Sequence, residues 1–161
     1  MNAQCIMLCS GKGGTGKSTV SVLLGASLAR LGRKVLLIEL DSGLRSVDII
    51  AGVYGRTVYD IEDVLCGRCE GGKAIVPSPL YTGLSVISAP YEGGEVLAAP
   101  LGKLVAAMRP YFDFMLHLLP LTRSVLHSLH PTLLPLTSSL PEPPLQILHS
   151  KIHWSVLHSV S

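Results

Sequence analysis

A glycine-rich loop between an apolar run and a helical run constrains this chain more than any other feature. Residues 5–9 (CIMLC) are apolar and too short for a helix, which predicts a buried parallel strand. Residues 10–19 (SGKGGTGKST) match GxxxxGK followed by serine or threonine. Residues 20–31 predict a helix that Gly32 ends. A strand, a glycine loop and a helix in this order predict a P-loop in an α/β fold.

Phosphate chemistry explains the spacing within this loop. Glycines let the loop wrap closely, so that successive backbone N–H groups point at phosphate oxygens, and the helix adds the positive end of its dipole. Lys17 can reach the β- and γ-phosphates, Ser18 can ligate Mg²⁺ between them, and Thr19 is expected at the α-phosphate. The residues predicted to bind the nucleotide are Gly11, Gly13, Gly14, Thr15, Gly16, Lys17, Ser18 and Thr19.

The candidates for a catalytic role are Lys12, Lys17 and Asp41. Lys12 is a second lysine early in the loop, which an ordinary P-loop does not need; simple surface charge is the alternative. Residues 34–40 (KVLLIEL) predict a second strand, which delivers Asp41 to its carboxyl end, where open α/β sheets place their ligands. There the carboxylate could hold the attacking water or a water on Mg²⁺, and a turn or helix cap is the alternative.

The rest of the organised region alternates between helices and strands. Residues 60–65 predict a short helix with acids near its positive end, and residues 84–88 (LSVIS) a third strand. Residues 101–108 predict a helix and residues 111–119 a fourth strand. This alternation predicts the P-loop NTPase class of α/β fold, with a doubly wound, mostly parallel sheet that is incomplete and leaves an uncovered edge.

The composition changes abruptly near residue 116. All sixteen glycines and ten of the eleven acidic residues lie at or before Asp113, whereas all six histidines lie beyond it. We therefore predict one domain over residues 1–119 and a disordered or irregular Leu/Ser/His/Pro-rich tail over residues 120–161. A metal-binding histidine tail is the alternative. Our hypothesis is a failure of the reading frame or gene model near Met115, which a confirmed nucleotide sequence without a sensible alternative frame would contradict.

Composition and charge argue against two classes of function. A net charge of +2 provides no basic field, so no nucleic-acid partner is expected. No apolar run reaches the roughly 18 residues needed to cross a bilayer, and the N-terminus lacks the pattern of a signal peptide, which predicts a cytoplasmic protein. Among Cys5, Cys9, Cys66 and Cys69 a single CxxC is a weak zinc signal, and core thiols are the preferred interpretation.

The loop sequence KGGTGKS, residues 12–18, resembles the signature of the MinD/ParA family of deviant Walker A ATPases. Residues 41–48 (DSGLRSVD), 51–52 and 57–67 (TVYDIEDVLCG) resemble its septum-placement branch, MinD, more than its DNA-partitioning branch. The resemblance extends from residue 3 to about residue 120. It implies an ATPase of cell-division site selection that uses ATP and Mg²⁺.

The resemblance also implies roles for particular residues. In an ATP-dependent homodimer Lys12 would reach the partner's phosphates, Lys17 and Ser18 would serve their own site, and Asp41 would assist attack by water. The family cycles on and off the inner face of the cell membrane, positions the division inhibitor MinC and is stimulated by MinE. The tail shows no counterpart of the family's C-terminal membrane helix, so we expect this chain not to perform the membrane step.

Two positions depart from the family pattern. Glu39 stands where the family usually has an aspartate, and Leu118, in the segment FDFMLHLLP, stands where the Walker B aspartate would support Mg²⁺. Whether the chain is an enzyme therefore stays open among a MinD-like ATPase, a ParA-like partition ATPase and a nucleotide-binding module without turnover. The second would need a basic DNA-facing surface. An aspartate restored at position 118 would separate the first from the third.

Overall fold

A computed structural model of the chain describes residues 3–10, 14–42, 44–90 and 98–120. The strands are β1 (Gln4–Ser10), β2 (Val35–Glu39), β3 (Val76–Pro77), β4 (Leu84–Ile87) and β5 (Phe114–Pro120). The helices are α1 (Lys17–Arg30), α2 (Ser46–Ile50), α3 (Ile61–Leu65) and α4 (Ala98–Met108), with 3-10 turns η1 (Gly71–Ala74) and η2 (Arg109–Tyr111). The predicted tail over residues 120–161 lies, apart from its first residue, outside the described residues.

The described strands form one sheet in the order β1-β5-β2-β4-β3. β5 lies between β1 and β2 and is parallel to both, and β2 is parallel to β4. β3 pairs with β4 in the antiparallel direction. The predicted α/β fold with a mostly parallel sheet is confirmed. The two-residue β3 and the five-residue α2 were not predicted, because neither is long enough to show a period in its sequence.

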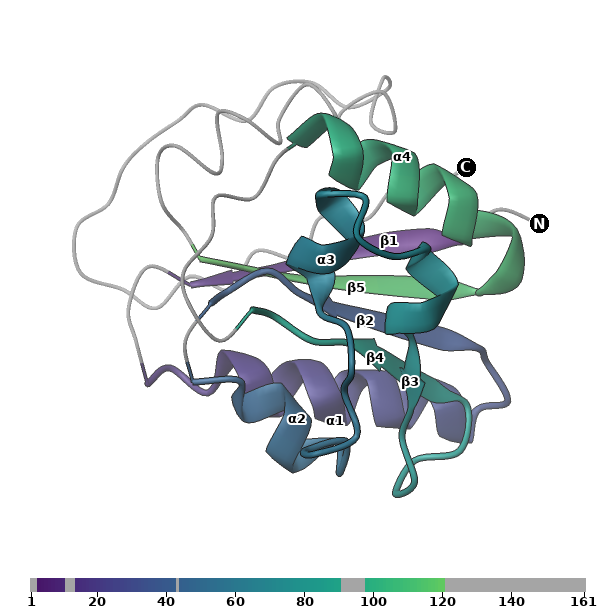
Figure 1. Cartoon of the computed structure of the whole chain (residues 1–161). Helices are drawn as coiled ribbons and strands as arrows, with labels where there is room; N and C mark the ends of the chain where they lie inside the picture. Colours follow the sequence, from purple (N-terminus) through teal and green to yellow (C-terminus); the bar gives the residue numbers. More distant parts are fainter. Residues whose placement is uncertain (1–2, 11–13, 43, 91–97, 121–161) are drawn as a thin grey trace, which may run out of the picture.

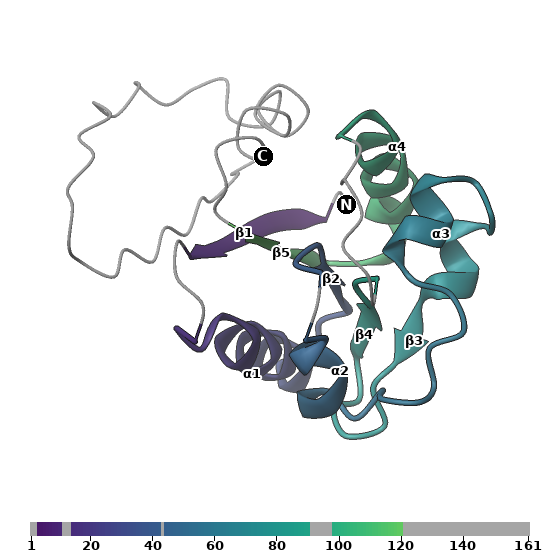
Figure 2. The same ribbon diagram turned by 60° about the vertical axis from the view of Figure 1, so that its left-hand side comes forward.

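Helices cover both faces of this sheet: α1 and α2 lie on one face, and α3 and α4 lie on the other (Figure 1, Figure 2). Successive side chains of a strand point to opposite faces. In β2, Val35 and Leu37 therefore belong to the core beneath α1 and α2, and Leu36 and Ile38 to the core beneath α3 and α4. All four are fully buried, which explains why the strand is an unbroken apolar run.

Local sequence fixes where the helices begin and how closely they pack. α1 begins at Lys17, three residues before the predicted start, directly after Gly16 in the left-handed conformation. At Gly25 an added Cβ would lie 2.9 Å from a methyl group of Leu84, so glycine lets α1 approach the sheet closely. Asp60 accepts hydrogen bonds from two N–H groups of the first turn of α3 and forms a capping box, as the acids there lead one to expect.

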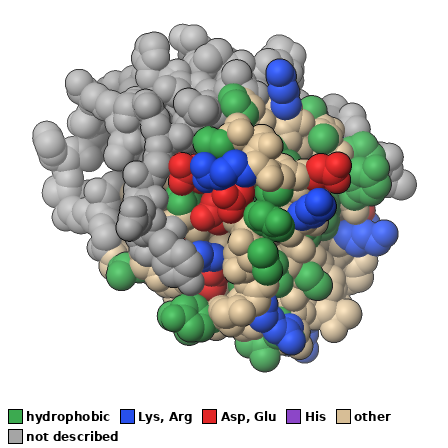
Figure 3. Space-filling view, viewed as in Figure 1, with side chains coloured by type: hydrophobic (Ala, Val, Ile, Leu, Met, Phe, Trp, Pro, Cys, Tyr) green, Lys and Arg blue, Asp and Glu red, His purple; other side chains and the backbone are tan. Residues whose placement is uncertain are grey.

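Charged side chains of both signs lie near one another on the face that carries α3. On this face lysine and arginine side chains are interspersed with acidic and apolar ones (Figure 3). Arg68 contacts Asp63 at 2.6 Å and Glu62 at 3.7 Å. On the described part of this face, acidic and apolar side chains therefore interrupt the positive charges.

The four cysteines differ in their surroundings, and all are free. Cys5 is buried, Cys9 and Cys69 are partly buried, and Cys66 is exposed. The core-thiol interpretation holds for Cys5 and is wrong for Cys66, because the chain turns at the surface after α3.

Within the described ranges no group of three His, Cys, Asp or Glu side chains is placed to hold a metal ion. None of the described helices is long and apolar enough to cross a membrane.

Candidate nucleotide-binding site

The candidate site lies at the carboxyl ends of β1 and β2, where the loop after β1 enters α1. Gly14 and Gly16 have φ angles of 73° and 80°, in the left-handed region that is costly for other residues. Apart from the adjoining residues of the chain, no described residue would lie within 4 Å of a Cβ at either position, so the backbone angle, rather than space, requires glycine. The predicted site residues Gly11, Lys12 and Gly13 lie outside the described residues.

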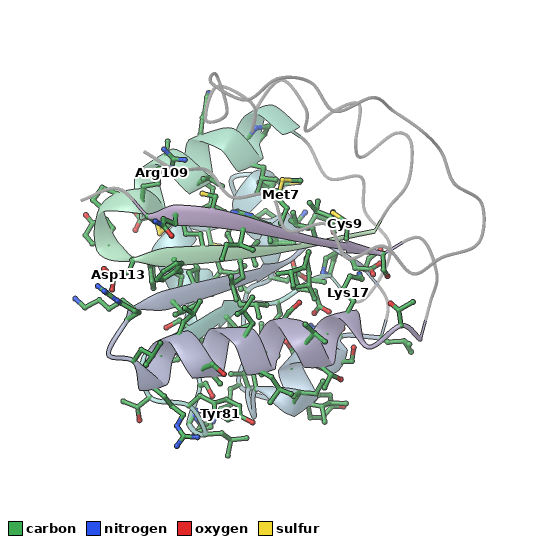
Figure 4. The ribbon with its side chains drawn as sticks, turned by 180° about the vertical axis from the view of Figure 1, so that it is seen from behind. Met7, Cys9, Lys17, Tyr81, Arg109 and Asp113 are labelled. Atoms are coloured by element: carbon green, nitrogen blue, oxygen red, sulfur yellow. The ribbon has the colours of Figure 1, made fainter. Side chains whose placement is uncertain are left out.

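Two of the predicted catalytic residues contact each other in this site. The Lys17 ammonium, on the first residue of α1, forms a salt bridge with the Asp41 carboxylate just beyond β2. The Lys17 side chain is 10% exposed and that of Asp41 is 40% exposed. Lys17 thus lies between the end of the sheet and the amino end of α1 (Figure 4). An ammonium held here points into the place where the loop and the helix dipole attract phosphate.

Hydroxyl groups connect the loop to its neighbours. The Ser46 hydroxyl donates to the Ser18 hydroxyl at 2.9 Å, which ties the start of α2 to the predicted Mg²⁺ ligand. The Thr15 hydroxyl donates to the Ser10 hydroxyl at 2.8 Å, across the loop. Thr19 is exposed on α1. The sequence did not predict a role for Ser46, because α2 had not been identified and nothing in the chain order places it beside Ser18.

A buried polar network supports the segment that follows Asp41. Arg45, with φ of 43°, is 4% exposed and donates its Nε–H to Asp48 at 2.8 Å. Ser88, just after β4, donates to the other oxygen of Asp48 at 2.6 Å. Thr57 lies 3.1 Å from the Ser88 hydroxyl. This network was not predicted: the residues 41–48 were quoted for their resemblance, but their burial depends on β4 and α2 packing together.

Glu39 and Leu118 lie opposite each other on β2 and β5 at the same end of the sheet. Leu118 is fully buried in the apolar core beneath α1. Glu39 is 2% exposed, and its Oε2 atom has no hydrogen-bond partner in the part of the chain that the structure describes. The pKa of Glu39 is raised to about 7, chiefly by burial and next by the carboxylate of Asp48, against the opposing ammonium of Lys17. The sequence analysis identified both positions as departures from the family pattern, but only the structure shows that they lie opposite each other.

The oxygen atoms available in this site suit Mg²⁺. They are the hydroxyl of Ser18 and the carboxylates of Asp41 and Glu39, of which Glu39 has a buried oxygen without a partner. In nucleotide sites Mg²⁺ is usually held by one or two carboxylates together with phosphate oxygens and water. The described residues gather no complete metal cluster of their own. Such a cation would therefore depend on bound phosphates for part of its ligands.

Comparison with known proteins identifies a family and relatives that the chain resembles. The family model for the CobQ/CobB/MinD/ParA nucleotide binding domain matches residues 6–126. The septum site-determining protein MinD of Bacillus subtilis is 35% identical to the chain over 116 residues, which are 70% of this chain and 43% of that protein. The chain thus spans less than half the length of this curated relative.

Solved structures agree with the sequence comparison. The MinC:MinD cell division protein complex of Aquifex aeolicus contains a chain with a TM-score of 0.69 and 35% identity, and the match covers 80% of this chain and 53% of that one. MinD of Pyrococcus horikoshii in complex with Mg-ADP has a TM-score of 0.60 and 25% identity, covering 70% of this chain and 48% of that one.

Proposed function

The chain belongs to the CobQ/CobB/MinD/ParA nucleotide binding domain family, and from this we propose that it binds ATP with Mg²⁺ and acts in septum-site selection as a MinD-like ATPase. One observation supports this proposal above the others. Lys17 occupies the amino end of α1 directly after the left-handed Gly16, and it contacts Asp41 at the end of β2. A phosphate-binding cation and a candidate water-orienting carboxylate therefore share one site.

Nucleotide binding is expected to exchange the partner of Lys17. The salt bridge to Asp41 is partly exposed, and phosphate oxygens carry more charge and also accept bonds from the loop amides and the helix end. Lys17 then turns to the β- and γ-phosphates. The released Asp41 can accept a hydrogen bond from the water that attacks the γ-phosphate and orient it. Mg²⁺, when bound, neutralises part of the phosphate charge.

A second candidate function, nucleotide binding without turnover, is favoured by Leu118. This residue is fully buried among apolar side chains where a Walker B aspartate is expected. A site that lacks this carboxylate can hold a nucleotide through its loop while it stabilises the transition state poorly. The ParA-like alternative is less favoured, because a net charge of +2 offers little attraction for DNA.

The partners follow from the same proposal. Lys12 would serve the phosphates of a second copy of the chain in an ATP-dependent homodimer. MinC is the proposed partner of that dimer, by analogy with the Aquifex aeolicus complex, and MinE is proposed to stimulate hydrolysis. The proposed place of action of this chain is the cytoplasm, whereas cycling on and off the inner face of the cell membrane belongs to the intact family.

Calorimetry with Mg-ATP on the 161-residue chain tests the proposal. We expect saturable binding that Lys17→Ala abolishes. Lys73→Ala is the matched control, because this exposed lysine lies on η1 away from the loop and its loss should leave binding unchanged. No binding by the unchanged chain, or equal binding by Lys17→Ala, would refute the proposal. A phosphate-release assay on the same samples then separates turnover from binding alone.

A further inference from the structure

Glu39 is a buried acid whose position the fold alone does not explain. It ends β2, two residues after Leu37, and therefore faces the core beneath α1. Only 2% of the residue is exposed, and none of the described residues forms a hydrogen bond with its Oε2 atom. Burying a carboxylate without a partner is costly, so an atom in this state calls for a ligand or a structural reason.

The charges around Glu39 are those of the nucleotide site. Lys17 and Arg45 favour its ionised form, and Asp48 and Asp41 disfavour it. The other two carboxylates already have partners: Asp41 contacts Lys17, and Asp48 accepts bonds from Arg45 and Ser88. Among the described residues of this site, Glu39 is therefore the acid with a buried oxygen left to bind something.

The position of Leu118 indicates what that oxygen could bind, because the family pattern expects an aspartate that supports Mg²⁺ at this position. It lies opposite Glu39 in the register of β2 and β5, and its side chain shares the same face. Neighbouring strands are about 4.8 Å apart, so a carboxylate on one strand end lies close to the position that the other strand presents. A glutamate at 39 is also one methylene longer than the aspartate that the family resemblance expects there.

Building on the proposed function, we propose that Glu39 supplies the carboxylate that supports the nucleotide-bound divalent cation. It would do so in place of the aspartate that the family pattern expects at position 118, where this chain has leucine. The support would be direct or through a coordinated water, since both use the same carboxylate chemistry. Ser18 would remain the hydroxyl ligand. The proposal gives a chemical reason for a buried acid whose Oε2 atom has no hydrogen-bond partner among the described residues.

The test compares ATP affinity in Mg²⁺ and in EDTA, by calorimetry on the full chain. The unchanged chain is expected to bind ATP at least about tenfold more tightly in Mg²⁺, and Glu39→Gln is expected to lose most of this ratio while keeping its affinity in EDTA. Glu62→Gln is the matched control, because this carboxylate lies on α3 at the opposite face of the sheet. Electron paramagnetic resonance with Mn²⁺ and ATP should show that the affinity for Mn²⁺ falls by about 10- to 100-fold in Glu39→Gln and is unchanged in Glu62→Gln.

A double variant, Glu39→Gln with Leu118→Asp, returns an acid from the neighbouring strand and is expected to restore Mn²⁺ affinity. An unchanged Mg²⁺-to-EDTA ratio in Glu39→Gln would overturn the proposal. ATP binding by the unchanged chain with no preference for Mg²⁺ would overturn it as well, but would leave nucleotide binding intact. No ATP binding in either buffer would overturn the proposed function itself.

Discussion

Replacement of His117 is the perturbation whose effect on stability the structure predicts most fully. His117 lies on β5 between Met7 of β1 and Ile38 of β2, and it is fully buried. Within the described ranges of the chain, neither Nδ1 nor Nε2 of its ring has a hydrogen-bond partner. Burial, together with the smaller effect of the positive charge of Arg109, lowers its pKa to about 4. The ring is therefore neutral and unpaired at physiological pH.

Two contributions to the free energy of unfolding follow from this environment. An unsatisfied buried polar group costs about 1–3 kcal/mol, so His117→Leu should stabilise the chain by about that amount at pH 7. Because the pKa of His117 is lowered from 6.5 to about 4, the unchanged chain loses a further amount of roughly 3 kcal/mol of stability in acid, which His117→Leu does not lose. At pH values between these two pKa values, the unfolded chain binds a proton at His117 and the folded chain does not. The stability of the unchanged chain therefore falls as pH falls through this window, and the advantage of His117→Leu grows.

Urea unfolding followed by circular dichroism between about pH 7.5 and 4.5 measures both contributions. His117→Gln is the control, since it keeps an unpaired polar group at the same place but does not titrate. We expect His117→Gln to gain little at pH 7 and to lose the acid dependence. Equal stability of His117→Leu and the unchanged chain at pH 7, or a difference that stays constant with pH, would refute the reasoning.

Three further perturbations test individual contacts. Asp48→Ala deprives the buried Arg45 guanidinium of this carboxylate and is expected to cost about 3–5 kcal/mol in urea unfolding; a loss below about 1 kcal/mol would contradict the network. Gly16→Ala places a side chain at φ 80° and should cost about 1–2 kcal/mol, with weaker ATP binding by calorimetry; an unchanged Tm would count against it. Asp60→Ala removes the capping box of α3 and should cost about 1 kcal/mol of stability, measured by thermal melts; an unchanged Tm would contradict this role of Asp60.

Local pattern was enough to predict β1, β2 and α1 at the candidate nucleotide site, but not α2. The apolar runs before the loop and before Asp41 identified β1 and β2, because strands buried on both faces need apolar residues throughout. The spacing of Gly16 and Lys17 located the start of the phosphate-binding helix to within three residues. The roles of Lys12 and of the tail stay predictions, since both lie outside the described residues.

The sequence by itself determined the class of fold and predicted the kind of ligand, because a P-loop is a continuous segment whose glycines and lysine are expected to act on the same phosphates. Tertiary structure alone decided which side chains stand beside that segment. Leu118 opposes Glu39 because β5 inserts between β1 and β2, and Ser88 reaches Asp48 because β4 lies beside β2. His117 is buried for the same reason. Strand order brings together residues far apart in the chain, and no local period of the sequence encodes that order.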